Sequence, residues 1–386
     1  MIQGVIESQC NRKGNRDEEI VVYPGGGGRV GRGDDRDSRF AEDVTEVVDL
    51  DPAAFELPEG LAVDADGNIY FGLAPTREIR RMTPSGEVSS SAKLPAAPEG
   101  AFETLGLAFN AAGELFAPMG SFDPTTHGVK KISTDGVEAA VFASLPATGL
   151  PNVLVFHSDG SLFASDTLGS SVRKIDTDGN AETWVSDLLL AGLDPPGPFG
   201  IPIGPNGVVF DADESNLYVA VTDFHRVIKV PVNADGTAGV AEVFAEDAET
   251  LCMSDGLTFD SDGNLYAASL GIDGVSWISP SGEITVVHLG EPLQNPSDVK
   301  FGIGADSDTL YVANFAFLRF NGLVAGDPTP GILTITPSPE PMPVVATPAT
   351  GDPLVGKLVL VGLALGLMLV TGGGALVHVS RRKETV

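Results

Sequence analysis

The chain has 386 residues and a formal net charge of −30, which argues against binding to nucleic acid through neutralisation of phosphates. Hydrophobic residues make up 42% of the chain, enough for a packed core, and the 47 glycines suit a fold with many tight turns. Two cysteines are too few for a disulfide scaffold. Because Cys10 falls in a polar segment, we do not expect it to pair with Cys252.

Residues 1–42 are predicted to be a disordered polar tail. The four glycines at 25–28 resemble a phosphate-binding loop, but no Gly-Lys-Ser or Gly-Lys-Thr follows, and no strand-to-helix context surrounds them. The tail also lacks the apolar stretch of a signal peptide. We therefore predict neither a nucleotide site nor a leader in this segment.

Residues 43–323 contain six short apolar runs, and each run is opened by a residue in the same register. The opening residues are Glu59, Leu105, Asn152, Asn206, Asp255 and Asp298, spaced 46, 47, 54, 49 and 43 residues apart. A period of this length with strand-like segments is typical of a β-propeller, in which equivalent positions surround one axis. Five of the six openers carry side-chain oxygens, and a hard cation such as Ca²⁺ binds such a set.

Each apolar run is followed by a second strand with an aromatic residue and by a third strand, which carries a basic residue in every repeat but the fifth. Five repeats also have a fourth strand. Turns rich in Asp and Gly separate the first two strands, which is a strong hairpin signal. In the sixth repeat we expect residues 317–320 to be the third strand, and residues 44–50 to supply the fourth. The sequence therefore predicts an all-β, six-bladed propeller closed by its N-terminal strand.

Two turns, at 64–68 and 260–264, resemble the opening of a calcium-binding loop. An EF-hand also needs a Glu at its twelfth position and flanking helices, but Pro75 and Gly271 stand at those positions. We interpret both segments as hairpin turns.

The C-terminal part is predicted to leave the propeller and cross a membrane. Residues 324–353 form a Pro/Thr-rich stalk, residues 354–379 a transmembrane helix and residues 380–386 a basic cytoplasmic tail. The run 358–377 has 20 residues without a charge, and a helix needs about 20 such residues to cross a bilayer. The basic residues at 381–383 favour a cytoplasmic end, which would put the propeller outside the cytoplasm.

An outward propeller requires an export signal, which residues 1–42 do not contain. Either the given start misses a true leader, or the protein is tail-anchored with the propeller inside the cell. We favour the first alternative because a stalk and a basic stop are typical of surface anchors.

The propeller resembles the SMP-30/gluconolactonase/LRE-like superfamily, whose relatives include paraoxonases and diisopropylfluorophosphatase-type hydrolases. The resemblance is carried, in chain order, by Pro58-Glu59-Gly60, Pro151-Asn152, Pro205-Asn206-Gly207 and Ser254-Asp255-Gly256. It implies a divalent cation, usually Ca²⁺, held by Glu59, Asn152, Asn206 and Asp255, with Asn152 as an alternative contact to substrate. It also implies that the protein is a hydrolase of lactones or related esters.

The cation would polarise the carbonyl or phosphoryl oxygen of the substrate, and Asp255 would act as general base or nucleophile. Sugar-acid lactonases of this kind commonly carry an Arg two residues before the third opener. Here that residue is Leu150, which makes a more apolar substrate easier to accommodate. Asp298 is predicted to support the site.

His157 is a candidate for contacting the substrate, because some relatives use a histidine near the metal. A surface role is the alternative for it and for the histidines at 127, 225 and 288. A second interpretation remains open for the whole domain, because Pro-Glu-Gly-Leu-Ala-Val-Asp at 58–64 also resembles NHL-type propellers. Such a protein would be a non-catalytic propeller that displays a surface for ligands or partners.

Overall fold

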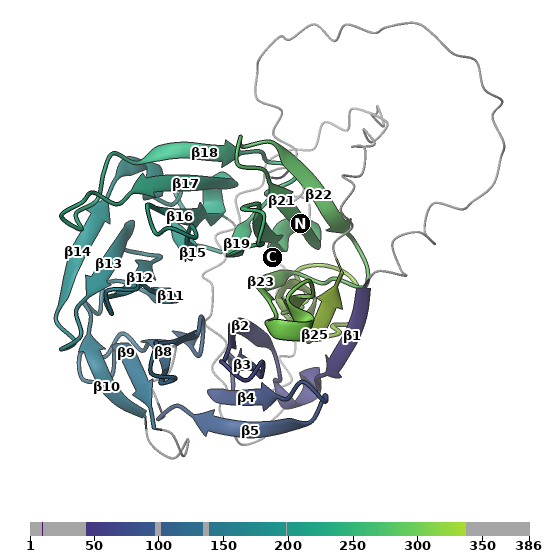
Figure 1. The fold of residues 1–386 in the computed structure, drawn as a ribbon. Helices are drawn as coiled ribbons and strands as arrows, with labels where there is room; N and C mark the ends of the chain where they lie inside the picture. The colour runs from purple at the N-terminus through teal and green to yellow at the C-terminus, as the bar shows by residue number, and fades with distance from the viewer. Residues whose placement is uncertain (1–9, 11–43, 97–101, 134–138, 198, 337–386) are drawn as a thin grey trace, which may run out of the picture.

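The computed structural model describes Cys10 and residues 44–96, 102–133, 139–197 and 199–336. Figure 1 shows the strands grouped into sheets that stand side by side in a ring around a central axis. Six sheets are present, each built from neighbouring antiparallel strands. The predicted six-bladed, all-β propeller is therefore confirmed.

The blades are numbered in chain order, and their strands have the following bounds. Blade one has β2 (Pro58–Val63), β3 (Ile69–Leu73), β4 (Glu78–Met82) and β5 (Val88–Lys93). Blade two has β6 (Phe102–Glu103), β7 (Ala108–Phe109), β8 (Leu115–Gly120), β9 (Gly128–Ile132) and β10 (Ala139–Ser144). Blade three has β11 (Pro151–Phe156), β12 (Leu162–Asp166), β13 (Ser171–Ile175) and β14 (Ala181–Ser186). Blade four has β15 (Pro205–Phe210), β16 (Asn216–Val221), β17 (Arg226–Pro231) and β18 (Glu242–Glu246).

Blade five has β19 (Ser254–Phe259), β20 (Leu265–Ser269), β21 (Gly274–Ile278) and β22 (Ile284–Leu289). Blade six has β23 (Pro296–Phe301), β24 (Leu310–Asn314), β25 (Gly331–Ile335) and β1 (Val44–Asp49). The short helices of the described part are η1 (Pro52–Ala54), η2 (Leu188–Leu190), η3 (Thr222–Phe224), η4 (Leu270–Ile272), η5 (Gly304–Asp306) and α2 (Phe317–Phe320).

The innermost strand of each blade begins at one face of the ring, which we call the upper face. The turns that join first to second strands lie at the opposite, lower face. One such turn shows why the chain reverses there: both Asp66 and Asn68 donate their backbone N–H to Asp64 Oδ1, at 3.0 and 2.9 Å. Gly67 has φ +81°, a conformation that glycine adopts at no steric cost. Residues 64–68 are thus a hairpin turn, as predicted.

Aromatic side chains hold neighbouring blades together. In blades one to five, an aromatic residue on the second strand packs edge-to-face on the Phe that ends the inner strand of the next blade, with ring centroids 4.9–5.1 Å apart. The pairs are Tyr70–Phe109, Phe116–Phe156, Phe163–Phe210, Tyr218–Phe259 and Tyr266–Phe301. Such pairs contribute about 0.5–1.5 kcal/mol each beyond the area they bury. The recurring aromatic of the sequence repeat is therefore the contact between blades.

The N-terminal strand closes the ring as predicted, because β1 pairs antiparallel with β25 in blade six. The prediction that residues 317–320 form the third strand of that blade is wrong, since these residues form the helix α2. Ala316 takes a left-handed conformation, and Leu318 donates its backbone N–H to Asn295 Oδ1, which turns the chain away from the sheet. The third strand is β25, which lies within the predicted stalk. The proline-rich composition of the surrounding segment favoured the prediction of a stalk over that of a strand in this short apolar run.

A disulfide joins Cys10 to Cys252, with Cα atoms 5.3 Å apart, so the expectation that these cysteines stay unpaired is wrong. That Cα separation lies within the usual range for a disulfide. Cys10 is buried in an apolar cluster at the upper face with Met253, Leu270 and Leu318. Apolar contacts with residues distant in sequence bring the two sulfurs together, and no local sequence pattern predicts this disulfide.

In the described part of the chain, no helix has the length and apolar character needed to span a membrane. The predicted transmembrane helix at 354–379 and the tail at 380–386 lie outside the described residues, as does most of the stalk. Residues 1–42 lie outside them too, apart from Cys10.

Candidate metal centre on the propeller axis

The inner strands approach one another closely at the axis. A Cβ atom on Gly60 would lie 2.1 Å from the carbonyl oxygen of Leu105, and one on Gly207 would lie 2.1 Å from that of Asp255. Only glycine permits this approach, because any side chain would overlap the next strand. The residue before each glycine is a predicted metal ligand, so the same approach narrows the ring at the ligand level.

Glu59, Asn152, Asn206 and Asp255 are the second residues of β2, β11, β15 and β19. They occupy equivalent positions near the upper face, and each is only 5–6% exposed. Their own inner strands contact each other in sequence around the ring, from β11 to β15 and from β15 to β19. Four oxygen-bearing side chains are thereby buried at one level of the propeller.

Two threonines fix the orientation of the asparagine amides. Asn152 donates from Nδ2 to Thr167 Oγ1 at 3.2 Å, and Asn206 donates from Nδ2 to Thr222 Oγ1 at 3.2 Å. Each hydroxyl in turn donates its single proton to a backbone carbonyl at the start of the next inner strand, at 2.7 Å and 2.9 Å. A hydroxyl that has used its proton accepts only from the amide nitrogen. The oxygen of each amide must therefore point away from its threonine.

Those amide oxygens are buried without a hydrogen-bond partner. Asn152 Oδ1, Asn206 Oδ1 and Asp255 Oδ1 are all in this state. A buried polar atom with no partner costs about 1–3 kcal/mol, so three at one level call for a ligand. Two carboxylates and two amides form the oxygen donor set that Ca²⁺ takes in proteins. The residues present therefore fit a divalent cation.

The electrostatics of the two carboxyl groups agree with this. Burial raises the pKa of Glu59 well above its ordinary value, and the nearby charges of Asp255 and Asp298 raise it further. Burial and Asp298 likewise raise the pKa of Asp255. Lys300 opposes both shifts. Carboxylates that repel each other in a dry site are stabilised in their charged form by a cation.

Within the described residues, no three His, Cys, Asp or Glu side chains gather closely enough to hold a metal by themselves. The candidate centre has only two such groups, Glu59 and Asp255, and the remaining oxygens come from asparagines. A site of this composition depends on amides as much as on carboxylates.

The other predicted site residues differ in what they can offer. Asp298 is buried and accepts hydrogen bonds within the protein: Oδ2 accepts from Leu61 N, and Oδ1 accepts from Val299 N and from Lys300 Nζ, each at 2.8 Å. Leu150 is buried just before β11 and pairs through its backbone with Asp166 and Thr167. Leu105, the opener without an oxygen, is buried between β6 and β7.

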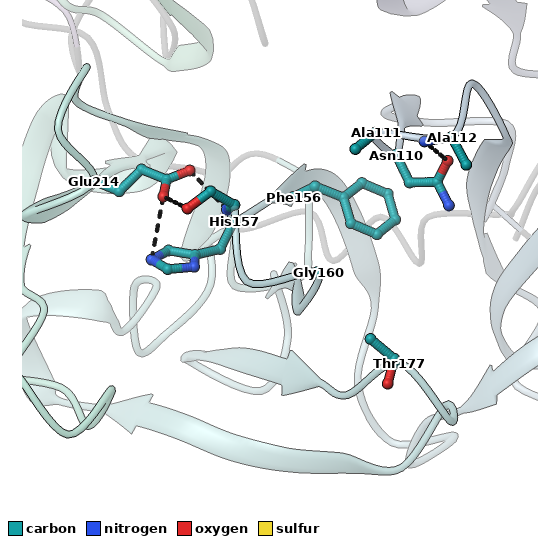
Figure 2. Close-up of a pocket in the computed structure, with 9 residues that line it drawn as sticks. Asn110, Ala111, Ala112, Phe156, His157, Gly160, Thr177 and Glu214 are labelled. Carbon is teal, nitrogen blue, oxygen red and sulfur yellow. Dashed lines mark hydrogen bonds and ion pairs between the residues drawn. The ribbon is translucent and has the colours of Figure 1, made fainter.

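His157 lies at the lower end of β11, five residues from Asn152, a separation of about 16 Å along a strand. It lines a cavity of about 410 Å³ between the lower turns of three blades, together with Asn110, Phe156, Thr177 and Glu214. Figure 2 shows His157 facing Glu214 there, with a nitrogen-to-oxygen distance of 3.5 Å. The structure therefore separates His157 from the candidate metal centre.

Several buried groups were not identified from the sequence. Thr167 and Thr222 follow their asparagines by 15 and 16 residues, so their nearly equal spacing in the repeat is a signal that could have identified them. The surface alternative for the histidines at 127, 225 and 288 is wrong, since all three are buried. His225 accepts from the backbone N–H of Met253 at 3.0 Å, which places it beside the start of β19.

Known proteins resemble parts of this chain in sequence and its described part in fold. Residues 201–315 match the family described as SMP-30/Gluconolactonase/LRE-like region. The pentonolactonase XacC of Haloferax volcanii is 29% identical over 150 residues, which are 38% of this chain and 46% of that protein. The gluconolactonase of Zymomonas mobilis subsp. mobilis is 24% identical over 308 residues, 70% of this chain and 80% of that protein. The match to the pentonolactonase thus spans less than half of its length.

Among solved structures, regucalcin of Agrobacterium tumefaciens, a calcium-binding protein, is similar with a TM-score of 0.55 and 20% identity. The similarity covers 76% of this chain and 96% of that one, and at this identity it shows the fold. The family match and the two lactonases confirm the predicted resemblance of the chain to the SMP-30/gluconolactonase/LRE-like superfamily.

Proposed function

We propose that the protein is a hydrolase of lactones or related esters that depends on a divalent cation, Ca²⁺ in the first place. The observation that carries this proposal is the ring of buried oxygens without partners at Asn152, Asn206 and Asp255. Lactonase activity in the names of two relatives supports the substrate class. The calcium-binding description of regucalcin supports the choice of cation.

Glu59, Asn152, Asn206 and Asp255 would hold the cation through their side-chain oxygens. A cation bound there would polarise the substrate carbonyl and stabilise the oxyanion that develops on it. The threonines that orient the two amides keep their oxygens directed at the centre before anything binds. Because the two amides are already oriented, few side chains would have to rearrange when a cation binds, and the free-energy cost of binding is lower.

Asp255 is the residue we assign to proton transfer. Burial and Asp298 raise the pKa of Asp255 in the metal-free protein, and a bound cation would favour the deprotonated carboxylate, which can then accept a proton. It would take a proton from the water that attacks the carbonyl, and return a proton to the ring oxygen as the lactone opens. The positive charge of Lys300 lowers the pKa of Asp255 and so favours its deprotonated form, which is the form that can accept a proton.

The surroundings of the upper face favour a substrate with apolar parts. Leu150 stands where sugar-acid lactonases commonly carry an Arg, and it is buried. The apolar cluster of Met253 and Leu270 adjoins the start of β19, with Phe317 packed against it. We therefore expect alkyl-substituted lactones to be better substrates than sugar-acid lactones.

The experiment is an assay of lactone opening by the full chain, followed by proton release at constant pH. A panel of alkyl and sugar-acid γ- and δ-lactones is tested in chelator and again after addition of Ca²⁺. We expect opening that is lost in chelator and restored by Ca²⁺, with alkyl lactones preferred. Absence of opening for every member, in a protein that binds Ca²⁺, would leave the alternative of a binding propeller.

We also propose that residues 354–379 anchor the protein in a membrane, with the propeller outside the cytoplasm. The support is the uncharged run at 358–377 followed by basic residues at 381–383. Protease added to intact cells should release the propeller by cutting between residue 336 and the run. Protection of the propeller, together with protected cytosolic markers, would favour a tail-anchored protein instead.

A further inference from the structure

A lysine lies near the axis, next to the candidate metal centre. Lys300 and Asp298 are two residues apart on β23, so their side chains leave the strand on the same side. The ammonium of Lys300 donates to Asp298 Oδ1 at 2.8 Å, to the carbonyl oxygen of Leu257 at 3.2 Å and to that of Val299 at 3.2 Å. An ammonium has three protons, so these three oxygens use all of its donors.

The three oxygens form a cage built by two blades. Leu257 belongs to β19 of blade five, whereas Asp298 and Val299 belong to β23 of blade six. Asp298 is itself fixed, because Leu61 of blade one donates its backbone N–H to Oδ2 at 2.8 Å. One carboxylate and two carbonyls are also the kind of oxygen donors that a hard cation binds. The ammonium therefore stands where a free cation would otherwise be stabilised.

Lys300 also acts on the buried carboxyl groups near the axis. Glu59, Asp255 and Asp298 are all buried, and the positive charge of Lys300 opposes the repulsion among them. Removal of the ammonium therefore makes the cage more negative, which favours the entry of a cation.

We propose that Lys300 is a built-in cation that fills a second oxygen cage, so that the wild-type chain takes up one divalent cation and loses this limit when the ammonium is removed. The inference rests on the proposed metal-dependent function, because it assumes the centre at Glu59 and Asp255. It goes further by assigning the cage of Asp298, Leu257 and Val299 as a latent cation site.

The test is isothermal titration of the chelator-treated full chain with Ca²⁺. We expect one Ca²⁺ for wild type and two for Lys300→Ala, whose shorter side chain leaves the cage open. Lys174→Ala is the matched control, because Lys174 lies on β13 with its ammonium 3.9 Å from Asp159 of a lower turn, and it should bind one Ca²⁺. In Lys300→Ala, thermal unfolding should begin at a lower temperature in chelator and be restored by Ca²⁺.

The outcomes separate this inference from the proposed function. One Ca²⁺ in both wild type and Lys300→Ala, with equal affinity, overturns the latent cage and leaves the function standing. No Ca²⁺ in wild type but one in Lys300→Ala supports the cage and removes the proposed centre. No Ca²⁺ in either protein overturns both.

If Lys300→Ala does not fold, Asp298→Asn provides the test with the opposite change of charge. It keeps the shape of the side chain but leaves the ammonium unbalanced beside the centre. We expect the Kd for Ca²⁺ to rise by about tenfold, because a positive charge without its carboxylate partner then lies near the bound cation. A folded Asp298→Asn protein with the Kd of wild type would overturn the inference.

Discussion

The upper and lower ends of β11 (Pro151–Phe156) both present polar side chains, but only those at the lower end are satisfied by the protein. At the upper end, the amide oxygen of Asn152 is buried without a partner. Just beyond the lower end, His157 faces Asp159 and Glu214 at 3.0 and 3.5 Å, and Glu214 also accepts from Ser158. The cavity lies at the lower end, whereas the buried oxygens without hydrogen-bond partners lie at the upper end. Unsatisfied buried oxygens are therefore a better guide to the chemistry of this propeller than the size of a hollow.

The largest expected effect concerns Asp255. Asp255→Asn keeps an oxygen near the centre but removes the base, so kcat for lactone opening should fall by about 10²–10⁴-fold. Asp262→Asn is the matched control, since Asp262 lies in the exposed lower turn of the same blade and its variant should retain full activity. Equal activity of the two variants would remove the distinction between the two ends.

A smaller loss is expected when the support of an amide is removed. Thr222→Val deprives the Asn206 amide of its acceptor, and the Kd for Ca²⁺ should rise by about 10–100-fold, as for other residues that orient metal ligands. Thr222→Ser retains the hydroxyl and should restore binding. Thr237→Val, in an exposed turn, is the control for a threonine without this role. Calcium titration measures all three, and an unchanged Kd in Thr222→Val would contradict the assigned orientation.

The stability of the metal-free protein should depend on pH through Glu59 and Asp255. Because their folded pKa values are raised, the native state binds more protons than the unfolded state above about pH 4. Stability in chelator should therefore fall as the pH rises, by up to about 1.4 kcal/mol per pH unit for each carboxyl group, until its folded pKa is passed.

Excess Ca²⁺ should offset this fall, since it binds the deprotonated carboxylates. Urea unfolding between pH 4 and pH 8 measures the effect. The control is the double variant Glu59→Gln/Asp255→Asn, which retains the strongly acidic surface and isolates the two groups. A parallel pH dependence in wild type and double variant would show that neither carboxyl has the shift described.

The smallest effect is expected at the lower end. Glu214→Gln weakens the contacts to Ser158 and His157, so the free energy of unfolding should drop by about 1 kcal/mol. Lactone opening and the Kd for Ca²⁺ should be unchanged. A large loss of activity would mean that the lower cavity takes part in function, which would reverse the comparison of the two ends.

Much of this architecture could be predicted because each blade repeats the same pattern of residues in the sequence. The openers Glu59, Asn152, Asn206 and Asp255 share one register, and burial at equivalent positions follows from the symmetry of a propeller. The closing strand at 44–50 could be predicted because the sixth repeat lacked a partner strand. Because the pattern repeats, residues at equivalent positions of the repeats can be predicted to lie near each other around the axis.

Features that occur only once could not be predicted in this way. The disulfide between Cys10 and Cys252 joins residues that share no repeat, and the third strand of blade six follows a long connection that interrupts the period. Likewise, Lys300 resembles any basic residue on a strand in the sequence, and only the fold shows that it donates to the carbonyl oxygen of Leu257 in blade five. His157 directly follows the strand that Asn152 opens, and the length of that strand separates the two side chains.

The central claim is that four side-chain oxygens on the propeller axis hold one divalent cation. Anomalous diffraction from crystals of the full chain soaked in Mn²⁺, repeated after exchange with excess Ca²⁺, tests it directly. We predict one anomalous peak surrounded by oxygens of Glu59, Asn152, Asn206 and Asp255. The peak should be lost in the exchange, and the calcium form should show Ca²⁺–oxygen distances of about 2.3–2.6 Å. A peak elsewhere with this centre empty, or no peak in crystals that contain Mn²⁺, would contradict it.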